Sequence, residues 1–111
     1  MEIIMTLGPG GSFTLSITSS ASGEVIAKAS LTCPPDCDDS HPDPAAACKQ
    51  LSQFNGRIEG IPEDPGPCTR ELKPVIVAAS GTWNGEPRYY KQEFSNRCVA
   101  IRATGGVIFA L

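Results

Sequence analysis

The dipeptide Asn84-Gly85 lies between two runs of strand-forming residues, and this arrangement constrains the fold more than any other stretch of the chain. Residues 75–79 are apolar and β-branched, and residues 88–94 are rich in aromatic and charged side chains. An Asn-Gly pair readily adopts the left-handed backbone conformations of a two-residue hairpin turn. The sequence therefore predicts an antiparallel β-hairpin closed at Asn84-Gly85, with Trp83 at its tip.

Further strands are predicted on both sides of this hairpin. Residues 12–19 alternate between apolar and hydroxyl side chains, which is the pattern of a half-buried strand. Residues 24–32 follow a Ser/Gly-rich turn and predict a neighbouring antiparallel strand. The apolar segments 2–7 and 107–111 predict a first and a last strand, with a glycine- and proline-rich break at 8–11.

One short helix is predicted at residues 45–54. Asp43 is suited to the N-cap, and Pro44 to the first helical position, where its missing amide hydrogen costs nothing. Asn55-Gly56 provides a left-handed stop. We therefore expect an α+β fold of one domain, residues 1–111, with a five- or six-stranded antiparallel sheet, one or two short helices packed on one face, and disulfide staples.

Composition excludes several classes of function. A formal net charge of -3 and a pI near 5.0 provide no basic field for nucleic acid. The sequence contains no apolar run of 18 residues, so we expect no membrane span. Five cysteines in 111 residues are typical of an oxidising compartment. We expect a secreted, extracellular protein, although residues 1–5 lack the pattern of a signal peptide.

Residue spacing leaves the state of the cysteines open, since two bridges among five cysteines allow 15 arrangements. An alternative is a tetrahedral zinc site, and with it a secreted metal-binding or structural binding module. Its four ligands would be Cys33, Cys37, His41 and Cys48. The spacing differs from the usual two-residue separation of zinc-binding cysteines, so we expect neither a metal nor any other cofactor.

The sequence gives no support for an enzyme. His41 is the only histidine, and it lies between Ser40 and Pro42 in a predicted loop. A nucleophile needs a base held at hydrogen-bonding distance, and neighbouring residues in one loop do not provide that geometry. The acidic residues near 36–43 lack EF-hand spacing and are interpreted as a solvated loop. We predict no catalytic residues.

The segment 67–74 is the strongest candidate for a functional surface. It is polar, lacks helix or strand periodicity, and has a proline at each end that restricts the backbone. Arg70 follows Cys68 by two residues, so its side chain is expected to project from a loop fixed near its base. Taken alone, one arginine in a loop is more simply a solvated surface charge.

Several motifs from residue 31 onward resemble those of the Streptomyces subtilisin inhibitor family. They are Leu31-Thr32-Cys33, His41-Pro42 with Cys48, Cys68 with Pro74-Val75, Gly81-x-Trp83-x-Gly85 and Phe94-Ser95-Asn96-x-Cys98. Cys37 has no counterpart in this pattern. The resemblance implies a secreted, usually dimeric inhibitor of serine proteases, with bridges Cys33–Cys48 and Cys68–Cys98.

The resemblance also implies where a protease would bind. The reactive bond would be Arg70-Glu71, and Asn96 would support the loop by hydrogen bonds to its backbone. The protease-binding loop would further contain Pro67, Cys68, Thr69, Leu72 and Lys73. Arg70 fits the primary pocket of trypsin-type proteases, which has an acid at its base. We expect serine proteases of the trypsin and subtilisin types as partners, and a homodimer.

Overall fold

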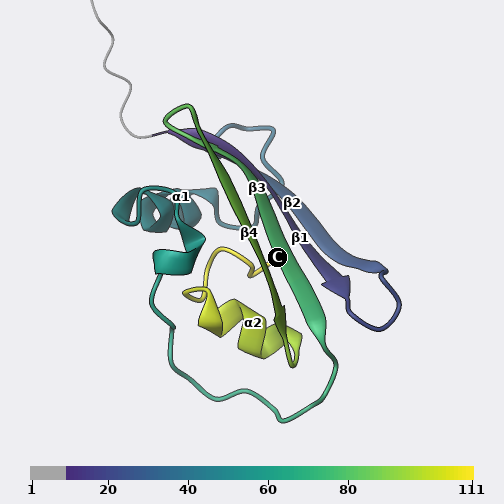
Figure 1. Ribbon diagram of the computed structural model, residues 1–111. Helices are drawn as coiled ribbons and strands as arrows, with labels where there is room; N and C mark the ends of the chain where they lie inside the picture. Colours follow the sequence, from purple (N-terminus) through teal and green to yellow (C-terminus); the bar gives the residue numbers. More distant parts are fainter. Residues whose placement is uncertain (1–9) are drawn as a thin grey trace, which may run out of the picture.

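The computed structural model describes residues 10–111. Figure 1 shows a curved antiparallel sheet with two helices beside it. The elements in chain order are β1 (Gly11–Ser19), β2 (Val25–Cys33), α1 (Pro44–Gln53), the short 3-10 helix η1 (Ile58–Gly60), β3 (Val75–Trp83), β4 (Glu86–Phe94) and α2 (Arg97–Ala103). Among the described residues, no helix combines the length and apolar character needed to cross a membrane.

In the part of the chain that the structure describes, the sheet has four strands in the order β2-β1-β3-β4, so β1 lies between its sequence neighbour β2 and the distant β3. The expected five or six strands are therefore not confirmed within residues 10–111. The expected strand at 2–7 lies outside the described residues. The antiparallel strands and flanking helices agree with the predicted α+β class.

The expected last strand at 107–111 is wrong. After α2 the backbone passes through Gly105 and Gly106, whose φ values of 97° and 86° are accessible to glycine at little cost. The following residues form turns, and the side chains of Ile108 and Phe109 are completely buried. The segment is apolar because it fills the core. Phe109 packs against Tyr90 of β4, with ring centroids 6.3 Å apart.

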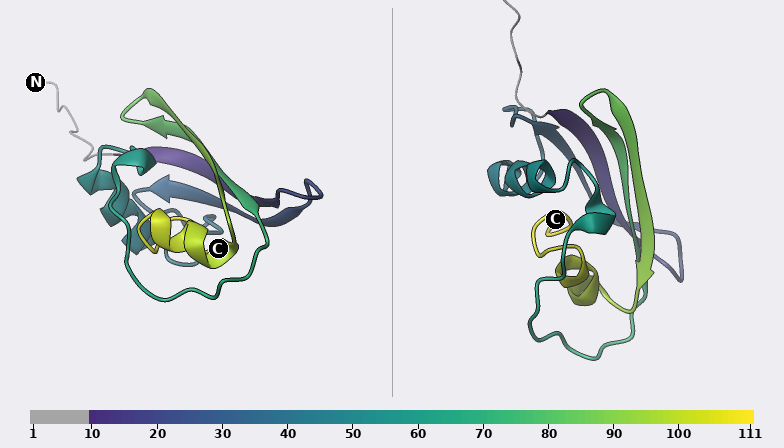
Figure 2. Two further views of the ribbon diagram at one scale, coloured as in Figure 1. Left: turned by 60° about the horizontal axis from the view of Figure 1, so that its bottom comes forward. Right: turned by 60° about the vertical axis from the view of Figure 1, so that its left-hand side comes forward.

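Both helices pack on the same face of the sheet, as Figure 2 shows from the side. Alternation along β1, β2 and β3 places an apolar row of each strand on this face. The core contains Leu15, Ile17, Leu31 and Val77 from the strands, with Leu51 from α1 and Ala100 from α2. The opposite face of the sheet is not covered by any of residues 10–111.

Local sequence signals correctly predicted helix α1 and the β3–β4 hairpin. The Asp43 side chain accepts a hydrogen bond from the amide of Ala46, and Pro44 is the first helical residue. Asn84 and Gly85 have φ values of 50° and 81°, as the hairpin turn requires. Trp83 lies beside this turn but is only 1% exposed, because its ring packs inward.

A long irregular segment connects η1 to β3 and passes around α2. Residues 62–74 contain no helix or strand. In Figure 1 this segment lies at the end of the sheet opposite the Asn84-Gly85 turn. The sequence predicted only a turn at 95–98, whereas α2 begins there, directly behind the irregular segment.

Candidate functional site

The candidate site is the loop from Pro67 to Pro74, and its central side chains are exposed. Arg70 and Glu71 are both exposed, and the side chain of Leu72 is 78% exposed. An ion pair of 3.6 Å joins Lys73 Nζ to Glu71 Oε1, but both side chains are solvated and the pair contributes little to stability. The loop therefore presents side chains outward, and its order has to come from its backbone contacts.

Asn96 provides the contacts closest to the middle of the loop. Its side-chain nitrogen Nδ2 donates hydrogen bonds to the carbonyl oxygens of Thr69, at 3.1 Å, and of Glu71, at 2.8 Å. Asn96 is only 6% exposed, so these bonds are shielded from competition with water. The two accepting carbonyls lie on either side of Arg70, and one side chain therefore holds both arms of the loop.

The same asparagine begins helix α2. Its Oδ1 accepts a hydrogen bond of 2.9 Å from the amide of Val99, which makes Asn96 the N-cap. Both amide hydrogens and the amide oxygen are thus used. Because the helix fixes the position of Oδ1, the Nδ2 group of the same side chain points at the loop. Formation of α2 therefore orients the amide group that supports the loop.

Further backbone bonds hold the arm that follows Glu71. The amide of Lys73 donates to the carbonyl of Ser95 at 2.9 Å. The amide of Ser20, in the turn between β1 and β2, donates to the carbonyl of Pro74, also at 2.9 Å. Ser20 was missed by sequence reasoning. A turn serine gives no signal that it meets a segment more than 50 residues later.

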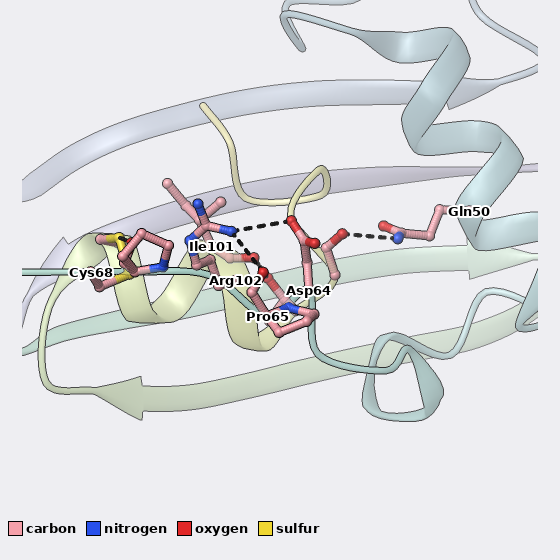
Figure 3. Close-up of polar contacts among 10 residues, drawn as sticks. Gln50, Asp64, Pro65, Cys68, Ile101 and Arg102 are labelled. Atoms are coloured by element: carbon pink, nitrogen blue, oxygen red, sulfur yellow. Dashed lines mark hydrogen bonds and ion pairs between the residues drawn. A yellow bond between two sulfur atoms is a disulfide. The ribbon is translucent and has the colours of Figure 1, made fainter.

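Two disulfides join the same cysteines that the resemblance implied. Cys33 bonds to Cys48, and Cys68 bonds to Cys98. The first connects the end of β2 to α1 within the core. The second bond joins Cys68, two residues before Arg70, to Cys98 in the first turn of α2. It therefore fastens the loop to the helix, as drawn in Figure 3.

The Cys33–Cys48 disulfide excludes the alternative zinc site. Cys33 and Cys48 are oxidised to a disulfide and offer no thiolates, and Cys37 is an exposed free thiol. His41, in the predicted loop, is buried. Its Nδ1 accepts from the amide of Asp43 at 3.0 Å, and its Nε2 lies 3.0 Å from the carbonyl oxygen of Ile108. Both ring nitrogens of His41 therefore have structural partners.

Comparisons with known proteins identify the family of the chain. The family model described as subtilisin inhibitor-like matches residues 10–96. The chain is 35% identical to a subtilase-type protease inhibitor of Streptomyces coelicolor over 95% of this chain and 69% of that protein. It is 33% identical to subtilisin inhibitor-like protein 7 of Streptomyces ambofaciens, over 95% of this chain and 91% of that protein.

A solved structure shares the fold. It is Streptomyces caespitosus sermetstatin in complex with Bacillus licheniformis subtilisin, with a TM-score of 0.66 and 27% identity over 87% of this chain and 93% of that chain. The relatives are protease inhibitors, which are not enzymes, in agreement with the absence of a predicted catalytic residue. From the extent of these matches, the chain belongs to the subtilisin inhibitor-like family.

Proposed function

We propose that this protein inhibits serine proteases of the trypsin and subtilisin types by offering Arg70-Glu71 as a substrate-like bond. The observation that carries this proposal is the pair of hydrogen bonds from Asn96 to Thr69 and Glu71, on both sides of the exposed Arg70. A protease binds an extended segment. When that segment is already ordered, association loses less conformational entropy, and the same contacts give tighter binding.

The contacts also explain how a cleavable loop acts as an inhibitor. The protease serine attacks the carbonyl carbon of Arg70, and the Arg70–Glu71 bond breaks to give an acyl-enzyme and a free amine on Glu71. That amine stays near the acyl carbon, because Asn96 holds the carbonyl of Glu71 and the Lys73 amide remains bonded to Ser95. Religation then competes with hydrolysis.

Arg70 determines the first class of target in this proposal. Trypsin-type proteases have an acid at the base of the primary pocket, and an exposed guanidinium matches that charge. Subtilisin-type proteases follow from the family and from the sermetstatin complex, which is a complex of that relative with subtilisin. Extracellular location fits the two disulfides, which persist in oxidising compartments.

We propose that the protein is a homodimer, which is the assembly that the resemblance implies. Each chain would form a single domain over residues 1–111. The observation that supports the dimer is the uncovered face of the sheet. Tyr89 is 69% exposed there, beside the small side chains of Thr14, Ala78 and Ser80. A molar mass of twice 11.7 kDa by light scattering would support the dimer, and a mass near 11.7 kDa at all concentrations would contradict it.

The proposed function is tested by titrating active-site-quantified trypsin and subtilisin with the purified, unreduced protein. Stoichiometric loss of activity is expected for both enzymes. Terminal sequencing after long incubation should show a single new amino terminus at Glu71. Cleavage at other bonds without inhibition would show that the loop is an ordinary substrate, and the proposal would be wrong.

A further inference from the structure

Helix α2 contacts the chain a second time, ahead of the loop, through Arg102. Arg102 Nη1 lies 3.5 Å from Asp64 Oδ2 and donates to the carbonyl oxygen of Pro65 at 3.4 Å. In return, the amide of Asp64 donates to the carbonyl of Arg102 at 2.8 Å. Figure 3 shows the guanidinium directed at both Asp64 and Pro65. The contact thus combines an ion pair with bonds to and from the main chain.

Two glycines provide the space for this contact. A Cβ atom on Gly66 would lie 2.2 Å from Arg102 Nη1, so the guanidinium occupies the space beside a residue without a side chain. Gly106 has a φ of 86°, and its Cβ would lie 2.4 Å from Asp64 Oδ2. A side chain at either position would displace one member of the Asp64–Arg102 pair. The absence of side chains at Gly66 and Gly106 therefore leaves the space that the Asp64–Arg102 pair occupies.

The turn that follows Arg102 is itself fixed to the rest of the molecule. Gln50 of α1 donates from Nε2 to the carbonyl oxygen of Gly105 at 3.1 Å, as Figure 3 also shows. Thr104 is buried, and its hydroxyl donates to the carbonyl of Ala100 at 2.8 Å. Arg102 therefore extends from a fixed base, although its own side chain is one-third exposed.

The disulfide at Cys98 and the contact of Arg102 can together fix the direction of the chain that leads into the loop. Cys98 and Arg102 are four residues apart and lie on one side of the helix. A disulfide at Cys68 fixes one point of the loop but leaves the chain before it free to pivot. A second contact at 64–66, one helical turn away, fixes the direction in which the chain enters Cys68.

We propose that Arg102 is a positioning residue for the inhibitory loop. It holds the arm that precedes Arg70, which carries the acyl group after attack by a protease, in the direction that religation requires. This role rests on the proposed function, because it assumes that Arg70-Glu71 is the bond presented. Arg102 does not touch the protease in this proposal, and acts through residues 64–68.

The experiment compares Arg102→Ala with Arg57→Ala, in which another exposed arginine is removed from the segment before η1. In the presence of a catalytic amount of trypsin, we expect Arg102→Ala to be cleaved at Arg70-Glu71 roughly fivefold faster than the unaltered protein, as for a partly exposed charged contact. Arg57→Ala should be cleaved at the unaltered rate. Arg102→Lys keeps the charge facing Asp64 and should recover part of the resistance.

Gly66→Ala provides an independent test, because it displaces the guanidinium while leaving Arg102 in the chain. It should accelerate cleavage as Arg102→Ala does. The double variant should be no faster than either single variant, because both changes remove the same contact. Additive acceleration by the two changes would overturn the assignment.

A readout without a protease separates positioning from general destabilisation. Amide hydrogen exchange should accelerate in Arg102→Ala at Asp64, whose amide donates to the carbonyl of Arg102, and remain unchanged at Asp39, whose amide donates to the carbonyl of Asp36. Unchanged exchange at Asp64, or an unchanged cleavage rate in an active inhibitor, would overturn the role of Arg102. If the unaltered protein inhibits neither trypsin nor subtilisin, the proposed function is wrong. The exchange result alone then decides whether Arg102 orders the loop.

Discussion

The side-chain nitrogen of Asn96 donates to the carbonyl oxygen of Glu71 across 2.8 Å, while the oxygen of the same side chain caps helix α2. One residue therefore links helix formation to loop order. Unlike a flexible surface side chain, this amide cannot turn away from the loop without also releasing the helix cap. The loop is ordered mainly by contacts with buried or partly buried groups of α2, and its exposed side chains remain available to a partner.

The two roles of Asn96 can be separated by substitution. Asn96→Ser keeps an oxygen that can cap α2 but is too short to reach Thr69 and Glu71, whereas Asn96→Ala loses both functions. We expect Asn96→Ala to lower stability by about 1 kcal/mol more than Asn96→Ser. Both should be cleaved by trypsin faster than the unaltered protein. Chemical denaturation and the rate of cleavage at Arg70-Glu71 measure the two effects. Slow cleavage of Asn96→Ser would contradict the support role.

Arg70→Asp should nearly abolish inhibition of trypsin. The substitution places a carboxylate where the primary pocket has its own acid, and loss of a charge-matched contact in such a pocket can weaken recognition by about 10⁴-fold. Because Arg70 is exposed, the melting temperature should stay the same. Inhibition constants for trypsin and subtilisin provide the measurement, and Arg57→Asp is the matched control. Trypsin inhibition that survives the change would exclude Arg70 as the pocket residue.

The two disulfides should differ in their effect on function. In the chain-entropy model, removing Cys33–Cys48 or Cys68–Cys98 by paired alanine substitutions costs about 3 or about 4 kcal/mol, respectively. Only loss of Cys68–Cys98 should also turn the protein into a rapidly cleaved substrate, since that bond holds the loop. Cleavage has to be measured at a temperature where both variants remain folded. Equal cleavage rates would show that the Cys68–Cys98 bond has no special role in the loop.

Gly56→Ala should be far more destabilising than Gly85→Ala. Both glycines have positive φ, at 72° and 81°, so both variants carry a conformational cost of about 1 kcal/mol. A Cβ on Gly56 would lie 2.5 Å from the Cβ of the buried Trp83, whereas Gly85 has open space around it. We expect an additional loss of about 2 kcal/mol for Gly56→Ala from this overlap. Urea unfolding followed by tryptophan fluorescence checks the difference, and equal losses would contradict the packing argument.

Local signals in the sequence were sufficient for the elements whose ends depend on neighbouring residues. Asp43-Pro44 predicted the start of α1, and Asn84-Gly85 predicted the turn of the hairpin, because capping and left-handed backbone are decided within a few residues. The segment 107–111 was wrongly predicted as a strand. A short apolar run has the same composition whether it pairs in a sheet or fills a core without pairing.

For the loop, the sequence by itself determined an exposed arginine two residues after a cysteine, between prolines, and its motifs identified the family. Through the family it implied the Cys68–Cys98 bond and the contact of Asn96 with the loop, but no residue pattern indicated the other contacts between distant segments. Only the tertiary structure decided that β1 pairs with β3, that α2 forms behind the loop, and that Arg102 reaches Asp64. The physical reason is that these contacts join segments many residues apart, and their energies depend on packing that no local pattern records.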